Sequence, residues 1–437
     1  MTQAATTDVA VVGGGLAGLA AATYLGRAGR SVTLFEKSRT LGGRAATHTK
    51  GDFRFNVGPH ALYRGGPGIK ILRDLGVEFS GGVPSASGGY AVDNGVKHAL
   101  PGGFVSLITT SLLRLPGKLE TARLLGTLPK IDASALQHMP VRQWLDTAIR
   151  QPDVRRLVQA LFRVSTYANA PQRQSAGNAV EQLQTALGSN VLYLNGGWQT
   201  LVDGLRAAAE AAGVRIVAGS RVEAIDCDVA VRGVRLAGGG LCRAGVVVIA
   251  ASPTEAAELV PDAHGAVMRE WADAAIPIKA ACLDVALSRL PRPRATFALG
   301  IDQPLYLSVH SAVAKLAPTG GATIHVAKYL DPDVSSDAKA DERQFEGLLD
   351  LIQPGWRDAV VDRRLLPSMT VYHALVTAAQ GGTAGRPGPA VPNIANLYVA
   401  GDWVGPQGLL ADASLSSARQ TAQLIARTPM LQAVAAA

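Results

Sequence analysis

The sequence contains little charge, few aromatic residues and almost no cysteine. Of its 437 residues, 17% are charged and 5% are aromatic, and only three are cysteines, Cys227, Cys242 and Cys282. These cysteines are far apart and form no CxxC pair, which excludes a disulfide framework and a zinc cluster built on cysteines. Apolar residues make up 48% of the chain, which excludes the polar, highly charged composition of disordered proteins.

The sequence also shows no targeting segment and no uninterrupted apolar run. Asp8 is the first charge, and no basic segment precedes the first apolar residues, so we expect a cytoplasmic protein. The longest apolar stretch, residues 9–25, is interrupted by four glycines. This favours a strand, a turn and a helix over a membrane span.

Basic residues are in excess, but they are not clustered in runs. The formal net charge is +8, and no basic run exceeds two residues. Since neither interleaved aromatics nor a helix-turn-helix pattern accompanies them, we expect no nucleic-acid partner. Residues 100–163 alone carry nine basic and four acidic residues, a net charge of +5.

Length and hydrophobic patterning predict an α/β protein of two or three domains. A strand over residues 8–12, a helix over 16–28 and a strand over 31–35 form an N-terminal βαβ unit. Residues 104–187 are mainly helical and broken by five prolines, which predicts a helical cap. Further helices are expected over 69–75, 201–212, 341–351 and 414–427, and further strands over 214–217, 222–225, 246–251, 280–287, 305–309, 323–329 and 397–400.

The junction of the first strand and helix carries a GxGxxG sequence. The glycines of Gly13-Gly14-Gly15-Leu16-Ala17-Gly18 allow a tight turn, close approach to a pyrophosphate and helix packing. The helix N-terminus would attract the phosphates. Glu36 ends the second strand, with 17 residues between it and Gly18, and can accept hydrogen bonds from a ribose hydroxyl. The pattern predicts a bound dinucleotide.

A second glycine motif identifies the dinucleotide. Gly42-Gly43-Arg44 offers backbone N–H groups and a fixed positive charge to a phosphate. Residues 39–47 resemble the GGRxxS/T motif of the superfamily of flavin-containing amine oxidases, protoporphyrinogen oxidases and carotenoid (phytoene) desaturases. The resemblance implies FAD rather than NAD. It also implies an α/β fold, in which a Rossmann-like (GR2-type) FAD-binding domain carries an inserted α+β substrate domain.

Further motifs resemble those of this superfamily in the same order along the chain. Residues 56–60 are similar to the Gly-Pro loop beside the flavin ring, and their histidine also resembles that of UDP-galactopyranose mutase. Segments 194–201, 219–225, 247–253 and 397–402 resemble later FAD-domain motifs. The FAD-binding residues expected from all these motifs are Gly13, Gly15, Leu16, Ala17, Gly18, Glu36, Lys37, Gly42, Gly43, Arg44, Gly58, Pro59, His60, Val222, Gly401, Asp402 and Ala413.

Two departures from the superfamily pattern limit what the resemblance implies. The usual GAxxSG segment near the C-terminus is replaced by residues 411–417, so the residues that donate to the flavin pyrimidine are not defined. No cysteine follows Cys282, so the cysteinyl-flavin link of some amine oxidases has no obvious residue. We therefore expect non-covalent FAD and no metal.

Catalytic residues are less well marked, because hydride transfer to a flavin mainly needs a positioned substrate in a dry pocket. The candidates are His60, which could orient substrate or be a structural donor, and Asp412, expected beside the flavin. An apolar substrate pocket could be lined by Tyr63, Lys279, Tyr372 and Trp403, of which Lys279 would be the water-holding lysine of amine oxidases or a solvated side chain. GxSxG, HExxH and P-loop motifs do not occur in the sequence, which excludes those classes of enzyme.

Together these motifs predict an FAD-dependent oxidoreductase that removes a hydride from a hydrophobic small molecule and resembles phytoene and squalene-type desaturases. Amine oxidation, isomerisation without net redox change and a non-catalytic FAD-binding role remain alternatives. The expected FAD-binding domain comprises residues 1–78, 193–265 and 390–437, and the expected substrate domain comprises residues 79–192 and 266–389.

The basic, leucine-rich part of the predicted cap suggests peripheral contact with an anionic membrane. Apolar side chains expected to face acyl chains alternate there with Arg114, Lys118 and Arg123, which could meet lipid headgroups. Those apolar side chains are Leu107, Ile108, Leu112, Leu113 and Leu115. In the alternative interpretation, they pack on the substrate domain and the basic residues are solvated.

Overall fold

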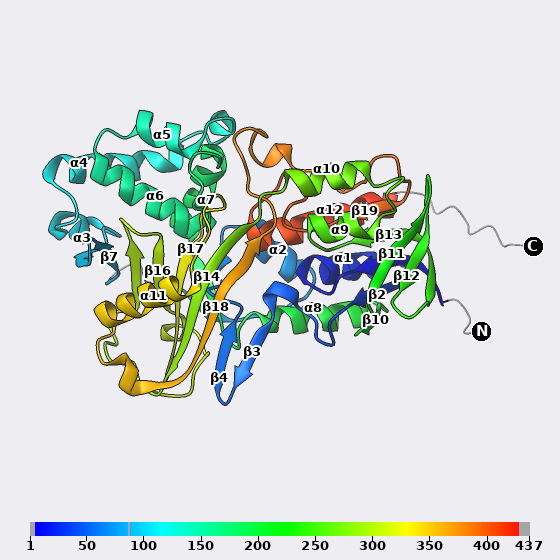
Figure 1. The fold of residues 1–437 in the computed structure, drawn as a ribbon, viewed down its shortest axis with the longest axis horizontal. Coiled ribbons are helices and arrows are strands. Elements are labelled where there is room, and N and C mark those ends of the chain that lie inside the picture. The colour runs from blue at the N-terminus through cyan, green and yellow to red at the C-terminus, as the bar shows by residue number, and fades with distance from the viewer. Residues whose placement is uncertain (1–4, 86–87, 428–437) are drawn as a thin grey trace, which may run out of the picture.

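The computed structural model describes residues 5–85 and 88–427. Two seven-stranded sheets organise this part of the chain. Figure 1 shows them in different halves of the molecule, with the first sheet near both chain ends and the second beside a group of helices.

The first sheet is built around parallel strands. Its strands follow the order β10, β2, β1, β13, β12 and β11, and β19 pairs with β13. Val9 and Val11 of β1 pack in one buried cluster while Ala10 and Val12 pack in another, because successive side chains point to opposite faces. Both faces are covered, which explains the continuous apolar sequence of the strand. The bounds are β1 Ala5–Val12, β2 Val32–Glu36, β10 Arg215–Ala218, β11 Val222–Cys227, β12 Val231–Leu236, β13 Leu241–Ile249 and β19 Leu397–Val399.

Helices cover both faces of the first sheet. Side chains of α1, α2, α8 and α12 share one core cluster with the sheet, and side chains of α9 and α10 belong to the cluster on the other face. The bounds are α1 Leu16–Arg27, α2 Pro67–Asp74, α8 Gln199–Ala211, α9 Pro253–Leu259, α10 Ala266–Ala274 and α12 Leu410–Arg427.

The second sheet is mixed and follows the order β18, β14, β17, β16, β15, β7 and β8. Leu283 and Val285 of β14 are fully buried and pack with Phe345 of α11, which covers this face. The bounds are β7 Tyr90–Asp93, β8 Val96–Ala99, β14 Ile278–Leu287, β15 Phe297–Gly300, β16 Leu305–Val309, β17 Ala322–Tyr329, β18 Val360–Tyr372 and α11 Ala338–Ile352.

A helical cap joins the second sheet, and two small sheets complete the described fold. Pro152 lies in the first turn of α6, where an N–H group would have no partner within the helix. Pro116 and Pro140 likewise lie at the starts of α4 and α5, so three of the five predicted breaks are helix starts. The cap consists of α3 Phe104–Thr109, α4 Leu115–Thr127, α5 Val141–Ala148, α6 Pro152–Thr166 and α7 Ala176–Ser189. The short strands are β3 Thr47–Lys50, β4 Phe53–Asn56, β5 Leu62–Tyr63, β6 Gly81–Gly82 and β9 Val191–Leu194.

The structure confirms the predicted fold class, a Rossmann-like α/β sheet with a second, mixed sheet and its helices. The longest strand, β18, was not expected. Its sequence contains Pro367, which a central strand would not tolerate, but β18 lies at the edge of the sheet and Pro367 is exposed there.

The cap carries a cluster of exposed apolar side chains, here called the α3–α4 apolar face. It consists of Phe104, Val105, Ile108, Leu115 and Leu119, and Phe104 is 79% exposed. The sequence-based prediction of which apolar side chains of the cap face outward was therefore only partly right. Ile108 and Leu115 are exposed as expected, but Leu107 and Leu113 are buried in the cap core, where they share a hydrophobic cluster with side chains of α5 and α6.

Within the described residues, no helix combines the length and the apolar character that crossing a bilayer requires.

Candidate functional site

A cavity of about 800 Å³ lies at the carboxyl ends of β1, β2, β13 and β19 and extends to the end of β18. Ligands of open α/β sheets bind at this edge. Its walls come from segments far apart in the sequence, namely residues 12–17, 35–37, 42–45, 57–61, 167, 198, 220–223, 250–259, 369–373, 400–402 and 410–414, although not every residue of each segment contributes.

The glycine-rich junction of β1 and α1 requires glycine at Gly13 and Gly18. Gly13 has φ +112°, and a Cβ there would lie 2.4 Å from the carbonyl oxygen of Ala250. A Cβ on Gly18 would lie 1.9 Å from the carbonyl oxygen of Gly13. Gly18 therefore does not line the cavity but lets α1 pack against the turn, which leaves the helix N-terminus facing the cavity.

The residues around this turn fit a pyrophosphate. Gly15 is the N-cap of α1 and provides no side-chain cap, and no acidic residue occupies the first turn of the helix. Gly15, Leu16, Ala17, Gly42 and Gly43 line the same part of the cavity. The unpaired N–H groups and the dipole of α1 thus favour an anion there.

Glu36 lies beside the turn, at the end of β2. Its carboxylate accepts hydrogen bonds from Gly14 N at 2.6 Å and from Ser38 N at 2.8 Å. Both bonds are to backbone, and a carboxylate retains further acceptor positions. Next to it, Lys37 forms an ion pair with Glu255 of α9, and both side chains line the cavity.

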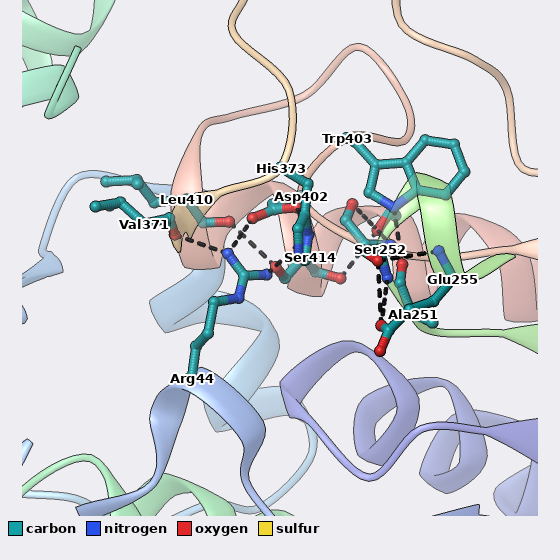
Figure 2. A network of polar contacts seen from close by, with 12 residues as sticks. Arg44, Ala251, Ser252, Glu255, Val371, His373, Asp402, Trp403, Leu410 and Ser414 are labelled. Carbon is teal, nitrogen blue, oxygen red and sulfur yellow. Dashed lines mark hydrogen bonds and ion pairs between the residues drawn. The ribbon is translucent and has the colours of Figure 1, made fainter. Parts of the chain in front are cut away.

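Arg44, His373 and Asp402 form a polar network in the middle of the cavity (Figure 2). Arg44 Nη1 donates to Asp402 Oδ2 at 2.5 Å and to the carbonyl oxygen of Val371 at 2.7 Å. His373 Nδ1 lies 2.9 Å from Asp402 Oδ1. Burial alone would raise the pKa of Asp402, but the charge of Arg44 and the contacts with His373 outweigh burial and hold it well below its usual range. Asp402 is therefore ionised.

His60 lines the cavity from the loop after β4. Its Nδ1 and Nε2 lie 3.0 Å from the carbonyl oxygens of Gly58 and Arg44, respectively. Burial lowers the pKa of His60 to about 4, so the ring is neutral near pH 7 and can donate to only one carbonyl at a time. Its ring also meets Trp198 edge-on at a centroid distance of 4.9 Å. His60 thus holds the loop against the 42–45 segment.

The far end of the cavity is mostly apolar. Tyr167, at the end of α6, is a left-handed residue with φ +60°, and its hydroxyl donates to the carbonyl oxygen of Pro59 at 3.1 Å. Burial raises the pKa of this hydroxyl well above its usual value, so it stays protonated. The side chains that form this wall are Val57, Ala61, Tyr167, Met369, Val371 and Leu410.

Most of the residues expected to bind FAD line the cavity, and three do not. Besides Gly18, these are Gly58 and Ala413. Gly58 has φ +76°, and a Cβ there would lie 2.2 Å from Met369 Cε, so this glycine lets the loop pack on β18. Ala413 is fully buried within α12. The other fourteen predicted positions line it, from Gly13 to Asp402.

The structure places the four expected pocket residues away from the cavity lining. Lys279 is exposed near the start of β14, whose other residues are buried. Tyr63 donates to the carbonyl oxygen of Ser165 at 2.6 Å, and Trp403 donates through Nε1 to the carbonyl oxygen of Ala251 at 3.0 Å. Tyr372 is fully buried on the opposite side of β18 from its cavity-lining neighbours Val371 and His373.

Asp412 is also not part of the cavity lining. It is buried in the first turn of α12, where Oδ1 accepts a hydrogen bond from Gly68 N at 2.7 Å at the start of α2. Burial raises the pKa of Asp412 to about 7, with the Gly68 hydrogen bond opposing this increase. Asp412 therefore connects α12 with α2.

Sequence reasoning missed several residues at the cavity, above all Tyr167, Met369, His373 and Leu410. None belongs to a motif that sequence alone makes visible. Two of them are marked by their backbone conformation. Tyr167 and Leu410 adopt the left-handed region, with φ +60° and +57°, although they are neither glycine nor asparagine. Such strained backbone tends to cluster at functional sites.

A buried cluster outside the cavity offers ligand atoms of the kinds that bind metals. The three atoms from Cys282, Asp284 and His325 lie within 4.8 Å of one another. However, the Asp284 carboxylate already pairs with Arg364 and lies 2.6 Å from His325 Nδ1. Burial raises the pKa of Asp284, but these two partners outweigh it and lower the value. The cluster is thus charge-balanced without a cation.

Comparison with known proteins agrees with this architecture. A family model described as flavin containing amine oxidoreductase matches residues 16–277. A triple mutant of putrescine oxidase superposes with a TM-score of 0.74 at 16% identity, covering 97% of this chain and 99% of that one. At this identity, the similarity shows a common fold.

Curated relatives match over shorter stretches. A carotenoid 3,4-desaturase from Haloarcula japonica is 51% identical over 59 residues, 14% of this chain and 12% of the relative. Protoporphyrinogen oxidase 2 of Arabidopsis thaliana is 34% identical over 114 residues, 26% of this chain and 22% of the relative. The chain thus matches less than a quarter of the length of either relative.

Proposed function

Because the chain belongs to the family of flavin-containing amine oxidoreductases, we propose that it is an FAD-dependent oxidoreductase acting on a hydrophobic small molecule. The substrate would be a polyisoprenoid or a similarly apolar compound, as in phytoene and squalene-type desaturases. FAD, when bound, accepts a hydride from a substrate carbon.

The chain's own residues have distinct tasks in this proposal. The glycine turn and the N-terminus of α1 bind the pyrophosphate, and Glu36 accepts hydrogen bonds from the ribose. Arg44 and Asp402 hold the middle of the cofactor, and FAD is bound non-covalently. The FAD-binding domain comprises residues 1–78, 193–265 and 390–437, and the substrate domain comprises residues 79–192 and 266–389. Residues 1–4, 86–87 and 428–437 of this division lie outside the described residues.

The observation that carries the choice of substrate is the apolar wall at the far end of the cavity. Val57, Met369, Val371 and Leu410 offer no charge to a cationic amine. Among the described residues, the only lysine at the cavity is Lys37, which lies at the opposite end beside Glu36, and Lys279 is exposed elsewhere. An apolar chain fits such a wall better than a charged amine does.

Amine oxidation is the second candidate, and the fold shared with putrescine oxidase favours it. Anaerobic titration of the FAD-loaded protein separates the two. Phytoene in detergent micelles should bleach the flavin absorbance, and putrescine should leave it unchanged. Bleaching by putrescine alone would reverse the ranking.

We further propose that the α3–α4 apolar face docks on an anionic membrane, where apolar substrates dissolve. Phe104, Val105 and Leu119 would insert among acyl chains. Arg114 and Arg123 are exposed on the same segment and would meet the headgroups. The net charge of +5 over residues 100–163 supports an anionic partner.

A further inference from the structure

His373 combines three features that the proposed function has not yet used. It directly follows β18, it lines the cavity next to the apolar wall, and its side chain retains 20% exposure. Figure 2 shows it beside Asp402, on the Arg44 side of the network.

The contact with Asp402 defines which ring nitrogen carries the proton. Asp402 is ionised and 1% exposed, and an ionised carboxylate can only accept hydrogen bonds. The nitrogen 2.9 Å from its Oδ1 is His373 Nδ1, which must therefore donate. In the neutral ring, Nε2 then carries a lone pair.

This lone pair is available to a ligand. Within residues 5–85 and 88–427, the polar contacts of the His373 ring all involve Nδ1, which lies 2.9 Å from Asp402 Oδ1 and 3.3 Å from Arg44 Nη2. A guanidinium cannot accept, so the hydrogen bond of the protonated Nδ1 is the one to Asp402. The other titratable side chains beside the apolar wall, His60 and Tyr167, already have backbone hydrogen-bond partners. Both nitrogens of His60 face backbone carbonyls, and the hydroxyl of Tyr167 donates to Pro59.

A carboxylate that orients a histidine through Nδ1 and leaves Nε2 free is the arrangement of a general base. We propose that His373 is the catalytic base of this site and that Asp402 is its orienting partner. The inference rests on the proposed function, because it concerns the proton that an oxidised substrate loses.

A substrate C–H bond breaks, its proton goes to His373 Nε2, and its electron pair forms the new carbon–carbon π bond. The neighbouring carbon loses a hydride, and its two electrons go to oxidised FAD. The resulting imidazolium is stabilised by the Asp402 carboxylate, whose charge Arg44 otherwise balances. Arg386 is the further charged group close to Asp402.

The test uses the FAD-loaded protein with two substitutions of His373 and one control. His373→Gln keeps a donor for Asp402 but provides no base, and His373→Ala leaves space for added imidazole. The control is His48→Gln, because His48 is exposed on the β3–β4 hairpin. The rate of anaerobic flavin reduction by phytoene is measured with the FAD dissociation constant.

We expect His373→Gln to slow reduction by about 100-fold or more while FAD affinity stays within about threefold of wild type. Imidazole should restore part of the rate in His373→Ala, which a merely structural role would not predict. His48→Gln should match wild type. Reduction by His373→Gln at nearly the wild-type rate would overturn the proposal.

A second measurement does not need the substrate. Diethyl pyrocarbonate, followed by peptide mass spectrometry, should modify His373 in the FAD-loaded protein, because its Nε2 is free. If His48 reacts and His373 does not, the assignment is wrong. If phytoene fails to reduce the flavin of the wild-type protein although His373 reacts with diethyl pyrocarbonate, the proposed substrate class is wrong. The assignment of a free Nε2 on His373 is then still supported.

Discussion

Arg44 and Asp402 are 358 residues apart in the sequence, yet Arg44 Nη1 lies 2.5 Å from Asp402 Oδ2. The first follows β2, and the second follows β19. Both strands belong to the parallel sheet, whose carboxyl ends meet at one edge, so the topology alone brings the two side chains together. This pair connects the early and late motifs of the chain at the cavity.

Replacing Arg44 should make the apoprotein less stable and less sensitive to acid. In wild type, the lowered pKa of Asp402 contributes stability above the unfolded value near 3.9, and this stability is lost as the pH falls below it. Arg44→Gln removes the charge opposite a buried carboxylate, but Arg44 is 36% exposed, so we expect a loss of about 2 kcal/mol at pH 7.

Urea unfolding of the apoprotein between pH 7 and pH 3 measures both effects. Arg206→Gln is the matched control, because its ion pair with Glu210 is exposed and should contribute at most about 0.5 kcal/mol. Equal losses in the two variants would show that the Arg44–Asp402 pair has no special contribution.

Glu36→Ala should weaken FAD binding by about 1.5–3 kcal/mol, or about 10- to 150-fold, because a charge-assisted hydrogen bond to ribose is lost. The same change removes the acceptor for Gly14 N, which holds the glycine turn. Glu36→Gln keeps a neutral acceptor and should lose less. Isothermal titration of the apoprotein with FAD gives the values, and an unchanged affinity in Glu36→Ala would remove Glu36 from the site.

Asp412 should make stability depend on pH in the opposite sense to Asp402. Its folded pKa of about 7 lies above its unfolded value, so the stability it contributes is complete below about pH 4 and is lost as the pH rises to 7. Asp412→Asn keeps an acceptor for Gly68 N and cannot ionise. It should therefore stabilise the protein at pH 8 by a few kcal/mol, about 4 at most, and change little at pH 4.

Thermal unfolding at the two pH values tests this prediction, with Asp273→Asn at an exposed position as the control. The control should shift stability by less than about 0.5 kcal/mol at either pH. A stabilisation by Asp412→Asn that is equal at pH 4 and pH 8 would contradict the proposed titration.

The α3–α4 apolar face should bind anionic vesicles and lose binding when its apolar side chains become polar. Changing Phe104, Val105 and Leu119 together to Ser should abolish co-sedimentation with phosphatidylserine vesicles at low salt. Val229→Ser with Val334→Ser is the control, because both are exposed valines outside this face. Wild-type protein that stays in the supernatant at low salt would show that the cap does not dock.

The fold was largely predictable, because its signals are local. The glycine turn at Gly13 and the apolar strand before it define the βαβ unit, and prolines mark the starts of cap helices. The edge strand β18 was missed, since Pro367 and two adjacent arginines conceal it. An edge strand needs only one buried face, so its sequence is a weak signal.

The cofactor end of the cavity was predictable for the same reason, and the substrate end was not. Phosphate binding requires glycines at fixed spacing, whereas an apolar wall can be built from any side chains of suitable size. Tyr167, Met369 and Leu410 reach the cavity only through tertiary packing. His373 gains its chemical identity from Asp402, 29 residues away, which no local pattern reveals.

The most direct test of the account is the identity and linkage of the bound cofactor. Purified protein, or apoprotein reconstituted with flavins and desalted, is precipitated with acid, and the supernatant is analysed by chromatography. We predict about one intact FAD per chain in the supernatant, and a strongly reduced yield from Arg44→Gln and Glu36→Ala. Flavin that stays with the precipitate would contradict non-covalent binding. Failure to retain any FAD would contradict the central claim that this cavity is an FAD site.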